Sequence, residues 1–599
     1  MLALISLLAL ISGACALPNA QAAVPAALQS NLAYRSPSLN VRALEIDTGA
    51  VFSRKRWANT FSGNLSFPFG VASGDPYSDS AVLWTMPRKV DPEGLYGGNA
   101  YPPICLLWVV APTNSSFKIE DSVQHGYVQT TIDIDFSVKV IADNLKPYTK
   151  YYYRFESCED EPDLGVSPVG SFKTLPAENA DVEKLRLAVF SCANYPFGFF
   201  NAYGAAASNS DRLDYVQHIG DYIYEYANGA YGDGTALNRI PQPLRECSSL
   251  QDYRDRYATY RSDPDLQKLH QLLAWQTVWD DHEVADNTWA HGSADSNDTV
   301  QGQIGLNQFS ARKANAVRAY FEWMPIRQVE TDDKLRIWRT FKLGKLATMI
   351  MLDTRQYDRS LTDLYYNTKQ VAAVADSSSR SMTGSKQQAW FFDQLKQHQE
   401  RKATWPLIMQ QVVFSRVNYT ISTEGSTDFN FDAWEGYRYQ REQILQFIKK
   451  QKIENTVVLS GDSHASWVFD LVETNSTTYN PATGEGALGV EFAGSAVSSP
   501  SSYGHGPSFT DEVYKGIAKG LTLASPSLLY AEGKLRGYFE LLVTPKAVQA
   551  HYYGFVDQAT RNYNVTEMGV FETLLGANRI TRPVNSGTVP VYGALGAHL

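Results

Sequence analysis

The most informative stretch of the chain is VQHIGDYIYEY (residues 216–226), in which a short, largely apolar run stops at a glycine and is followed by an acid and tyrosines. Such a run is typical of a buried parallel strand. Three other blocks follow the same pattern: FSCANY after 187–190, WDDHE after 275–279 and LSGDSH after 457–459. Ligands gather at the carboxyl ends of strands in an open α/β sheet. The four blocks therefore predict an α/β fold with one site at its strand ends.

The side chains that follow these runs are ones that bind hard metal ions. They comprise carboxylates, a phenol, an imidazole and a thiol. An aspartate placed after a strand is able to bridge two cations, and a phenolate three residues further on suits Fe³⁺. The sequence therefore predicts a centre of two or more metal ions. The six candidate ligands are Cys192, Asp221, Tyr224, Asp281, Asp462 and His464.

Neighbouring residues suit the chemistry of a phosphorylated substrate. His282 is a candidate proton donor or transition-state hydrogen-bond donor, and Asn287 offers an amide oxygen. Arg355, just beyond an expected strand, suits bidentate binding of phosphate, and Asp353 would orient it or bind metal. The segment GSAVSSP (494–500) follows another expected strand and would offer backbone N–H groups to an anion.

Each block has an ordinary alternative when it is considered alone. GDYIY fits a turn aspartate with a core tyrosine, WDDHE fits exposed acids at a helix start, and Asp353–Arg355 fits a structural ion pair. Cys192 is also open to a disulfide with Cys247 or to a role as a buried, inert thiol. All these alternatives must hold together for the site to be absent. The coincidence of the blocks at successive strand ends therefore favours the site.

Composition limits the class of protein. A chain of 599 residues suggests two or three domains. A hydrophobic content of 44% with 19% charged residues fits a folded globular protein. The net charge of −10 argues against nonspecific binding of nucleic acid. A small phosphorylated substrate remains compatible, because a metal site supplies local positive charge.

The N-terminus predicts export. Residues 1–16 are short and apolar and end in Ala-Cys-Ala, which is typical of a signal peptide, although a retained anchor is the alternative. We assign 1–22 to this leader and its processing region, and no other stretch is long and apolar enough to span a membrane. Together with N-x-S/T sequons, the leader favours a secreted glycoprotein, with retention in a cell wall or vacuole left open. The sequons begin at Asn64, Asn114, Asn297, Asn418, Asn475 and Asn564.

The patterning divides the rest of the chain into four parts. Residues 23–66 are expected to form an N-terminal arm, and 67–176 show short alternating runs that predict a β-sandwich. LKPYTKYYYR (145–154) is similar to the tyrosine corner of immunoglobulin- and fibronectin-like domains, and Cys105 and Cys158 are able to pair within this region. Residues 184–560 alternate strands with helices, which is α/β patterning, and 561–599 are expected to form a tail.

The expected elements of the α/β part are as follows. Helices are predicted at 249–273, 307–323, 386–400 and 435–451. Further strands are predicted at 345–352, 407–414, 488–492 and 538–543.

Taken in order, these motifs resemble one family. The blocks are FGVASGDP (69–76), AVLWT, SCAN, HIGDYIYEY, TVWDDHEVADN, LDTRQYDR and VVLSGDSHASW. Together they resemble the PhoD-type alkaline phosphatases and phosphodiesterases, from about residue 67 to about 500. The resemblance implies a sandwich domain in front of an α/β metallophosphoesterase core of mixed sheets and flanking helices, related to purple acid phosphatases.

The resemblance also implies a ligand set. That family's GDxxY motif matches Asp221 and Tyr224, and its GNHE-like position matches 281–283, with aspartate in place of asparagine. Its GHxH-like end matches 461–464, with Asp462 in place of the first histidine, while its VxxH histidine has no match near 410–415. Oxygen ligands in place of nitrogen ligands favour Ca²⁺ at the second position. The implied cofactors are Fe³⁺, with Cys192 as one ligand, and one or two Ca²⁺.

The function implied is hydrolysis of phosphate mono- or diesters by a metal-activated water, with Arg355 and His282 stabilising the developing charge. The alternative from another class is a secreted binding or adhesion glycoprotein that has lost catalysis on the same fold. Retention of all six candidate ligands argues against that alternative.

Overall fold

The computed structural model describes residues 31–35, 61, 63–90, 102–158, 165–296, 309–329, 333, 335–420 and 428–587. The expected leader (1–22), most of the expected arm and the sequon at Asn297 lie outside these residues. Among the described residues, no helix combines the length and the apolar character needed to cross a membrane.

A nine-stranded mixed sheet carries three of the four decisive blocks. Its centre is parallel, because β10, β11 and β12 pair side by side in the same direction, and its two flanks are antiparallel. The strands in spatial order are β22 (Thr566–Leu574), β21 (Ala547–Phe555), β20 (Arg536–Val543), β10 (Leu185–Phe190), β11 (Tyr215–His218), β12 (Ala274–Thr277), β2 (Val71–Gly74), β3 (Ala81–Thr85) and β7 (Val138–Ala142).

A second, seven-stranded sheet faces the first. Strands β14, β15, β16 and β18 are parallel, and β13, β17 and β19 are antiparallel additions. The strands in spatial order are β13 (Arg339–Leu343), β14 (Ala347–Met351), β15 (Trp405–Met409), β16 (Thr456–Ser460), β18 (Gly489–Ala493), β17 (Ser466–Asp470) and β19 (Leu528–Glu532).

Alternating side chains of the seven-stranded sheet define the layers. Met349, Leu407 and Leu459 belong to the large core between the two sheets, whereas Ile350 and Ile408 pack with helices on the outer face. Because successive strand residues point to opposite faces, both faces of this sheet are covered, as its near-continuous apolar runs require.

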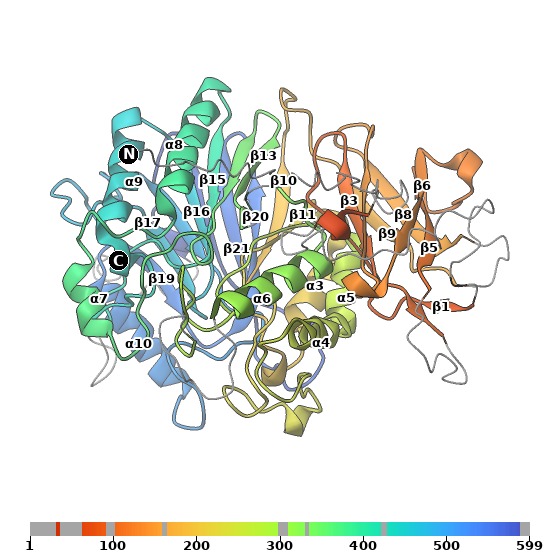
Figure 1. Ribbon diagram of the computed structural model, residues 1–599. Helices are drawn as coiled ribbons and strands as arrows, with labels where there is room; N and C mark the ends of the chain where they lie inside the picture. The colour runs from red at the N-terminus through yellow and green to blue at the C-terminus, as the bar shows by residue number, and fades with distance from the viewer. Residues whose placement is uncertain are drawn as a thin grey trace, which may run out of the picture.

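Helices cover the outer faces of both sheets (Figure 1). In that view the seven-stranded sheet with α8 and α9 lies at the left, and the N-terminal strands lie at the right. The helices are α3 (Asn201–Ser208), α4 (Leu250–Arg261), α5 (Pro264–Leu272), α6 (Phe309–Trp323), α7 (Thr368–Val374), α8 (Gly384–Glu400), α9 (Arg438–Gln451) and α10 (Asp511–Ala524).

The N-terminal part is a β-sandwich that shares a sheet with the core. One layer is the sheet of β6 (Gln124–Thr130), β5 (Ile104–Ala111), β8 (Lys150–Ser157) and β9 (Gly170–Lys173), and a ribbon of β1 (Leu65–Ser66) and β4 (Arg88–Lys89) lies beside it. The other layer consists of β2, β3 and β7, and β2 pairs in parallel with β12. The sandwich is thus continuous with the nine-stranded sheet.

Specific polar contacts lock this junction. Asp75, which follows β2, accepts a hydrogen bond from Arg339 Nη2 at 2.6 Å and donates its backbone N–H to the Trp275 carbonyl. A Cβ at Gly74 would lie 2.3 Å from the Pro325 carbonyl oxygen, so only glycine fits at this contact. The motif FGVASGDP therefore serves to join the two parts of the chain.

Several predicted features have counterparts in the structure. Cys105 and Cys158 form a disulfide, and the Tyr151 hydroxyl accepts the Lys146 N–H at 2.9 Å, as in a tyrosine corner. The helix expected at 249–273 is two helices, because Asp263 caps α5 and Pro264 begins it. The expected tail at 561–599 is different as well, since its residues 566–574 form β22 of the large sheet.

Candidate metal centre

The carboxyl ends of the parallel strands of both sheets meet at one place. Cys192, Asp221 and Asp281 follow β10, β11 and β12 of the nine-stranded sheet, whereas Asp462 and His464 follow β16 of the facing sheet. The Tyr224 hydroxyl lies 3.0 Å from His464 Nε2, so the two sheets contribute to a single cluster. The structure thus brings together all six candidate ligands.

The backbone at these positions is unusual. Cys192, Asp221, Asp462 and His464 have φ angles of 62°, 55°, 62° and 52°, which place them in the left-handed region. Non-glycine residues rarely adopt this conformation, which costs on the order of 1–3 kcal/mol each. Four such residues in one cluster indicate that the tight turns serve to aim the side chains rather than to stabilise the fold.

Two glycines allow the strand ends to approach closely. A Cβ at Gly220, where φ is 111°, would lie 2.3 Å from the Asp280 Cβ. A Cβ at Gly461 would lie 2.7 Å from the Ser191 Oγ, on the loop of the opposite sheet. The glycines of the GDY and GDS blocks are therefore required by packing between the loops that carry the ligands.

Three overlapping groups of side chains have donor atoms within 4.8 Å of one another. Asp221 belongs to the first two groups and Asp281 to the last two, so these carboxylates connect the groups into one extended site. The groups are Cys192, Asp221 and His464; Asp221, Asp281 and His282; and Asp280, Asp281 and Asp462. Asp280 was not among the predicted ligands, although it lies within the WDDHE block.

Tyr224 completes the first group. Its hydroxyl donates to Asp221 Oδ2 at 2.8 Å and lies 3.0 Å from His464 Nε2. Burial, followed by the charge of Asp221, raises the pKa of Tyr224 well above its usual range. A phenol in this position becomes a ligand only when a cation displaces its proton.

The carboxylates of the cluster are only partly compensated by the described residues, among which Arg355 pairs with Asp280 and Asp462 and lies 3.6 Å from Asp281 Oδ1. Asp221 Oδ1, Asp280 Oδ2 and Asp281 Oδ1 are buried and have no hydrogen-bond partner in the described structure. Burial, and secondarily the charges of neighbours such as Asp281, raises the pKa of Asp221 well above its usual range. Burying such groups without partners is costly, and a bound cation removes that cost. The donor set therefore fits metal ions.

Glu283 was matched to a family motif from the sequence but was not among the candidate ligands or catalytic residues. Its carboxylate accepts the backbone N–H groups of Tyr222 at 2.6 Å, Asp280 at 2.8 Å and Asp221 at 3.1 Å. It thereby fixes the turn that carries Asp221 to the turn that carries Asp281. Its place in the WDDHE block was the only sequence signal for this role.

Arg355 occupies a different environment from the phosphate-binding position that the sequence suggested. Its side chain is fully buried, and its three nitrogens donate to three carboxylates: Nε to Asp280, Nη1 to Asp432 and Nη2 to Asp462. Asp353 Oδ1 accepts the Arg355 backbone N–H at 2.9 Å. Since each nitrogen has a carboxylate partner, Arg355 neutralises and orients the acids.

Asp432 was not foreseen, because it follows no strand and has no motif around it. It accepts hydrogen bonds from Arg355 and from Thr362 Oγ1, and pairs with Arg359 at 3.0 Å. A carboxylate that reaches the site from a loop more than seventy residues after Arg355 leaves no local trace in the sequence.

His282 lies at the edge of the cluster and is about 9% exposed. Its Nδ1 lies 2.8 Å from Glu225 Oε2, and its ring stacks on Tyr224 with centroids 4.2 Å apart. Burial alone would lower the pKa of His282, but Glu225, Asp281 and Asp221 outweigh it and raise the pKa well above its usual range. The imidazole is therefore held as a hydrogen-bond donor.

Segment 494–500 does not present the anion site that its sequence suggested. The N–H groups of Gly494, Val497, Ser498 and Ser499 donate to backbone carbonyls of the strand-end loops. The Ser499 hydroxyl instead lies 2.8 Å from the Tyr224 hydroxyl and 3.0 Å from the Cys192 carbonyl. These four N–H groups and the Ser499 hydroxyl therefore support the loops that carry the ligands.

Cys192 and Cys247 are both free and fully buried, so the disulfide between them that the sequence left open is absent. The Cys247 thiol lies 3.6 Å from the Asp252 carbonyl, within the structure around α4. Cys192 alone shares a group with candidate ligands.

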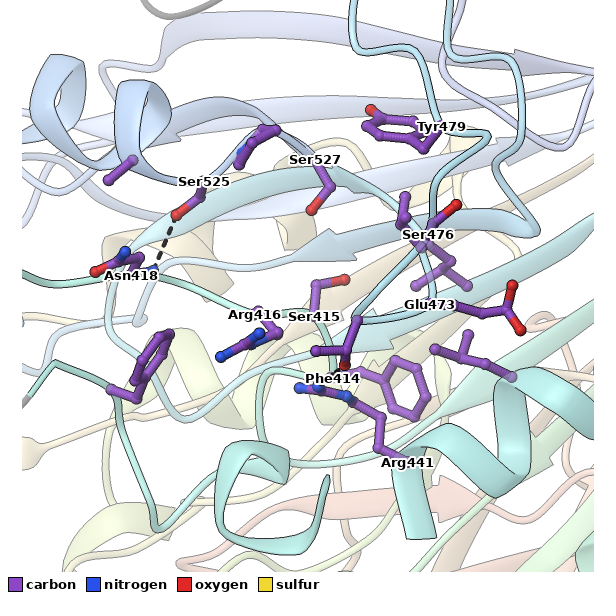
Figure 2. Close-up of a pocket in the computed structure, with 17 residues that line it drawn as sticks. Phe414, Ser415, Arg416, Asn418, Arg441, Glu473, Ser476, Tyr479, Ser525 and Ser527 are labelled. Atoms are coloured by element: carbon purple, nitrogen blue, oxygen red, sulfur yellow. Dashed lines mark hydrogen bonds between the residues drawn. The ribbon is translucent and has the colours of Figure 1, made fainter. Parts of the chain in front are cut away.

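A separate cavity of about 240 Å³ lies away from the cluster. Figure 2 shows Arg416, Arg441 and Glu473 among the side chains around it. The backbone N–H of Asn418 donates a hydrogen bond to the Ser525 hydroxyl there. None of the candidate ligands lines this cavity. The metal centre at the strand ends is therefore distinct from this cavity.

Comparisons with known proteins agree with this geometry. Residues 187–552 match the family model "PhoD-like phosphatase", and 53–176 match "PhoD-like phosphatase, N-terminal domain". Alkaline phosphatase D of Bacillus subtilis (strain 168) is 35% identical over 495 residues, covering 81% of this chain and 77% of that protein.

Solved structures give the same result. The structure of PhoD superposes with a TM-score of 0.69 at 32% identity, covering 88% of this chain and 95% of that one. The purple acid phosphatase PPD1 from yellow lupin (Lupinus luteus) seeds superposes with a TM-score of 0.50 at 11% identity, covering 85% and 74%. The latter likeness concerns the fold alone. The prediction of a metallophosphoesterase core behind an all-β N-terminal part is thus confirmed.

Proposed function

The chain belongs to the PhoD-like phosphatase family and is a phosphoric ester hydrolase, and we propose that it is a secreted, metal-dependent alkaline phosphatase or phosphodiesterase acting on small phosphate esters. The observation that carries metal dependence is the set of three buried carboxylate oxygens without a hydrogen-bond partner among the described residues, on Asp221, Asp280 and Asp281. Burial of these oxygens without a cation would lower the free energy of unfolding, and no hydrogen bond from a described residue would compensate for that loss.

In this proposal Fe³⁺ is held by Cys192, Asp221, Tyr224 and His464. Ca²⁺, one or two ions, is held by Asp221, Asp281 and Asp462, whose oxygens suit a hard cation. The phenol and the thiol in the first group would become anionic ligands on losing their protons to a cation, which supports the assignment of the trivalent ion to that group. When bound, the cations supply Lewis acidity for the phosphoryl oxygens and for the attacking water.

The protein's own residues orient the reaction. Glu283 fixes the two turns that carry Asp221 and Asp281. His282, held by Glu225 through Nδ1, has Nε2 left to donate to a phosphoryl or leaving-group oxygen. Arg355 acts as a positioning residue, because its contacts are with carboxylates.

Export and glycosylation are part of the same proposal. The leader at 1–16 supports secretion. The sequon asparagines Asn64, Asn114, Asn475 and Asn564 are exposed, so glycans have room at these positions. A fall in mass when the secreted protein is treated with an N-glycosidase would support both, and secreted protein without any glycan would contradict the glycoprotein assignment.

Metal analysis of purified protein, combined with an aryl phosphate assay, tests the function. We expect bound iron with a ligand-to-metal charge-transfer colour, loss of activity with a chelator, and recovery when Ca²⁺ is added. Full activity in colourless, iron-free protein would refute the iron assignment, and recovery with Zn²⁺ but never with Ca²⁺ would refute the calcium assignment. A fully metallated protein without activity would favour the binding or adhesion alternative.

Replacing Arg355 by methionine tests its positioning role. We expect the free energy of unfolding of metal-free protein to fall by about 3–5 kcal/mol, because breaking a buried ion network leaves uncompensated charges. The loss should be smaller in metal-loaded protein, since the cations then neutralise the same acids. Chemical denaturation of both forms gives the measurement.

The matched control is Arg416→Met, because Arg416 is about 35% exposed and its buried partner Glu435 keeps ion pairs with Arg438 and Arg441. Its loss should stay below about 1 kcal/mol. A raised KM for Arg355→Met with unchanged stability would instead show that Arg355 binds substrate.

A further inference from the structure

A continuous set of aromatic rings borders the metal centre on the side of His282. Centroid distances are 5.3 Å from His282 to Tyr226, 5.4 Å from Tyr226 to Tyr231 and 6.3 Å from Tyr231 to Tyr224. Since Tyr224 also stacks on His282, these four rings form a closed set. Phe197 extends it outward, 5.3 Å from Tyr231.

Aromatic side chains from three separate strand-end loops lie on this side of the metal centre, and some of them are open to solvent. Phe197 follows β10, and Tyr226 and Tyr231 follow β11. Tyr365, in the loop after β14, is about 69% exposed, and Tyr231 is about 38% exposed. We call Phe197, Tyr226, Tyr231 and Tyr365 the aromatic rim. Exposed aromatic side chains gathered beside a reactive centre are typical of a binding surface.

The backbone holds Tyr365 in place at a conformational cost. Its φ is 67°, in the left-handed region that bulky residues avoid. Its N–H donates to Asp363 Oδ1 at 2.9 Å, and its hydroxyl donates to Asp286 Oδ1 at 3.1 Å. A strained, tethered and exposed ring has no value for core packing, which points to a role in contact with a ligand.

Hydrogen bonds connect this loop to the metal centre. Asn287 Nδ2 donates to the Asp363 carbonyl at 2.8 Å, and the Asn287 N–H donates to Asp281 Oδ2 at 2.7 Å. The loop of Tyr365 is therefore fixed relative to a candidate metal ligand. The distance between a phosphate bound at the cations and the Tyr365 ring is therefore expected to be fixed.

The charge around the rim limits what binds there. Carboxylates act on Tyr226 and Tyr365, namely Glu225, Asp281, Asp286 and Asp432, whereas the His282 imidazole at the inner end of the rim acts on Tyr231. A second phosphate or an acidic group would be repelled at the outer side of the rim, near Tyr365, whereas an uncharged planar ring would gain contact with the aromatic side chains. Neighbouring rings of the set are tilted relative to one another by 28° to 66°.

We propose that the aromatic rim is a substrate subsite for a planar aromatic group, so that the preferred substrates are aryl or nucleoside phosphate esters. This inference rests on the proposed function, because it takes the phosphate to lie at the metal centre. Stacking of one ring on such a surface corresponds to a gain in affinity of about 5- to 100-fold.

Calorimetry on the metal-loaded enzyme tests the subsite without relying on turnover. The matched probes are phenylphosphonate and cyclohexylphosphonate, which share charge and approximate size but differ in planarity. We expect phenylphosphonate to bind at least about 5-fold more tightly. The preference should fall to about one in Tyr231→Leu/Tyr365→Asn, in which asparagine tolerates the positive φ.

The control variant is Tyr366→Asn, which removes a neighbouring tyrosine that is about 74% exposed and should leave the preference unchanged. Equal binding of the two probes, or a preference that survives the double substitution, would overturn the subsite. Tightest binding of phosphocholine, lost in the double variant, would replace it with a cation site.

The outcomes for the subsite and for the proposed function are distinguishable. Hydrolysis of esters without an aromatic group, a glycerol phosphate monoester and a glycerol phosphate diester, by the same preparations reports the function alone. Turnover without a planar preference would refute only the subsite. Absence of both turnover and phosphonate binding in fully metallated protein would refute the proposed function.

Discussion

Asp221→Asn is expected to abolish hydrolysis, lowering kcat by about 10³-fold or more. Asp221 belongs to both the group with Cys192 and His464 and the group with Asp281 and His282, and among the described residues it is the one carboxylate common to these two groups. Loss of its charge removes several kcal/mol of metal-based stabilisation, at about 1.4 kcal/mol for each tenfold in rate. Metal content of the purified variant and its kcat give the measurement.

The substitution is chosen so that the fold survives. Asn has nearly the shape of Asp and tolerates the left-handed conformation that Asp221 adopts with φ of 55°. It also removes the buried Asp221 carboxyl group, whose pKa is raised by burial. We therefore expect unfolding of the metal-free variant at equal or higher denaturant concentration than the wild type, even though activity is lost.

Asp135→Asn is the matched control. Asp135 also has a left-handed backbone, with φ of 52°, but it lies in the sandwich, where it pairs with Arg88 at 3.0 Å. Its substitution should change neither metal content nor kcat. Full activity and normal metal content in Asp221→Asn would refute the bridging role.

The sequence predicted the site better than it predicted the sheets around it. Cys192, Asp221, Asp281 and Asp462 stand directly after apolar runs, and the end of a parallel strand is a local feature. Each of these runs forms a strand in the structure, or ends within two residues of one. The ligands could therefore be predicted without knowing the strand order.

What the sequence did not predict depends on contacts between distant residues. Pairing of β12 with β2 makes the sandwich part of the main sheet, and β22 adds an edge from the expected tail. Both are pairings between strands that are far apart in the chain, and the local periodicity of a strand does not specify its partner.

Arg355 shows the same limitation at the site. An arginine after a strand fits phosphate binding and a structural ion pair equally well when only its neighbours are known. Asp432 and Asp462, which occupy its nitrogens, lie 77 and 107 residues away. Glu283 is a comparable case, because its role depends on the backbone of Asp221 on the neighbouring loop.

Cys192→Ser is expected to remove the iron, the colour and at least about 100-fold of the activity, since even outer-shell substitutions at metal sites cost about 10- to 100-fold. Burial, followed by the charge of Asp221, raises the pKa of the Cys192 thiol well above its usual range. The thiol is therefore neutral unless a cation displaces its proton, and serine is a much weaker anionic ligand in its place. Iron analysis and the visible spectrum give the measurement.

Cys247→Ser provides a control matched in burial. Cys247 is also a free, fully buried thiol, and burial raises its pKa to about 12. It lies beside the Asp252 carbonyl and belongs to none of the groups of candidate ligands among the described residues. A similar loss of iron in both variants would mean that a buried thiol matters here only for packing.

Peptide mapping without reduction separates ligation from cross-linking. Alkylation of the denatured protein should label Cys192 and Cys247, while Cys105 and Cys158 remain joined, as they are in the sandwich. A cross-linked Cys192–Cys247 peptide would refute the ligand role, because a sulfur in a disulfide has no thiolate to offer a metal. If the two were bonded, both serine variants would instead show the same loss of stability, about 2–5 kcal/mol. Selective loss of iron in Cys192→Ser alone is therefore the result that only metal ligation predicts.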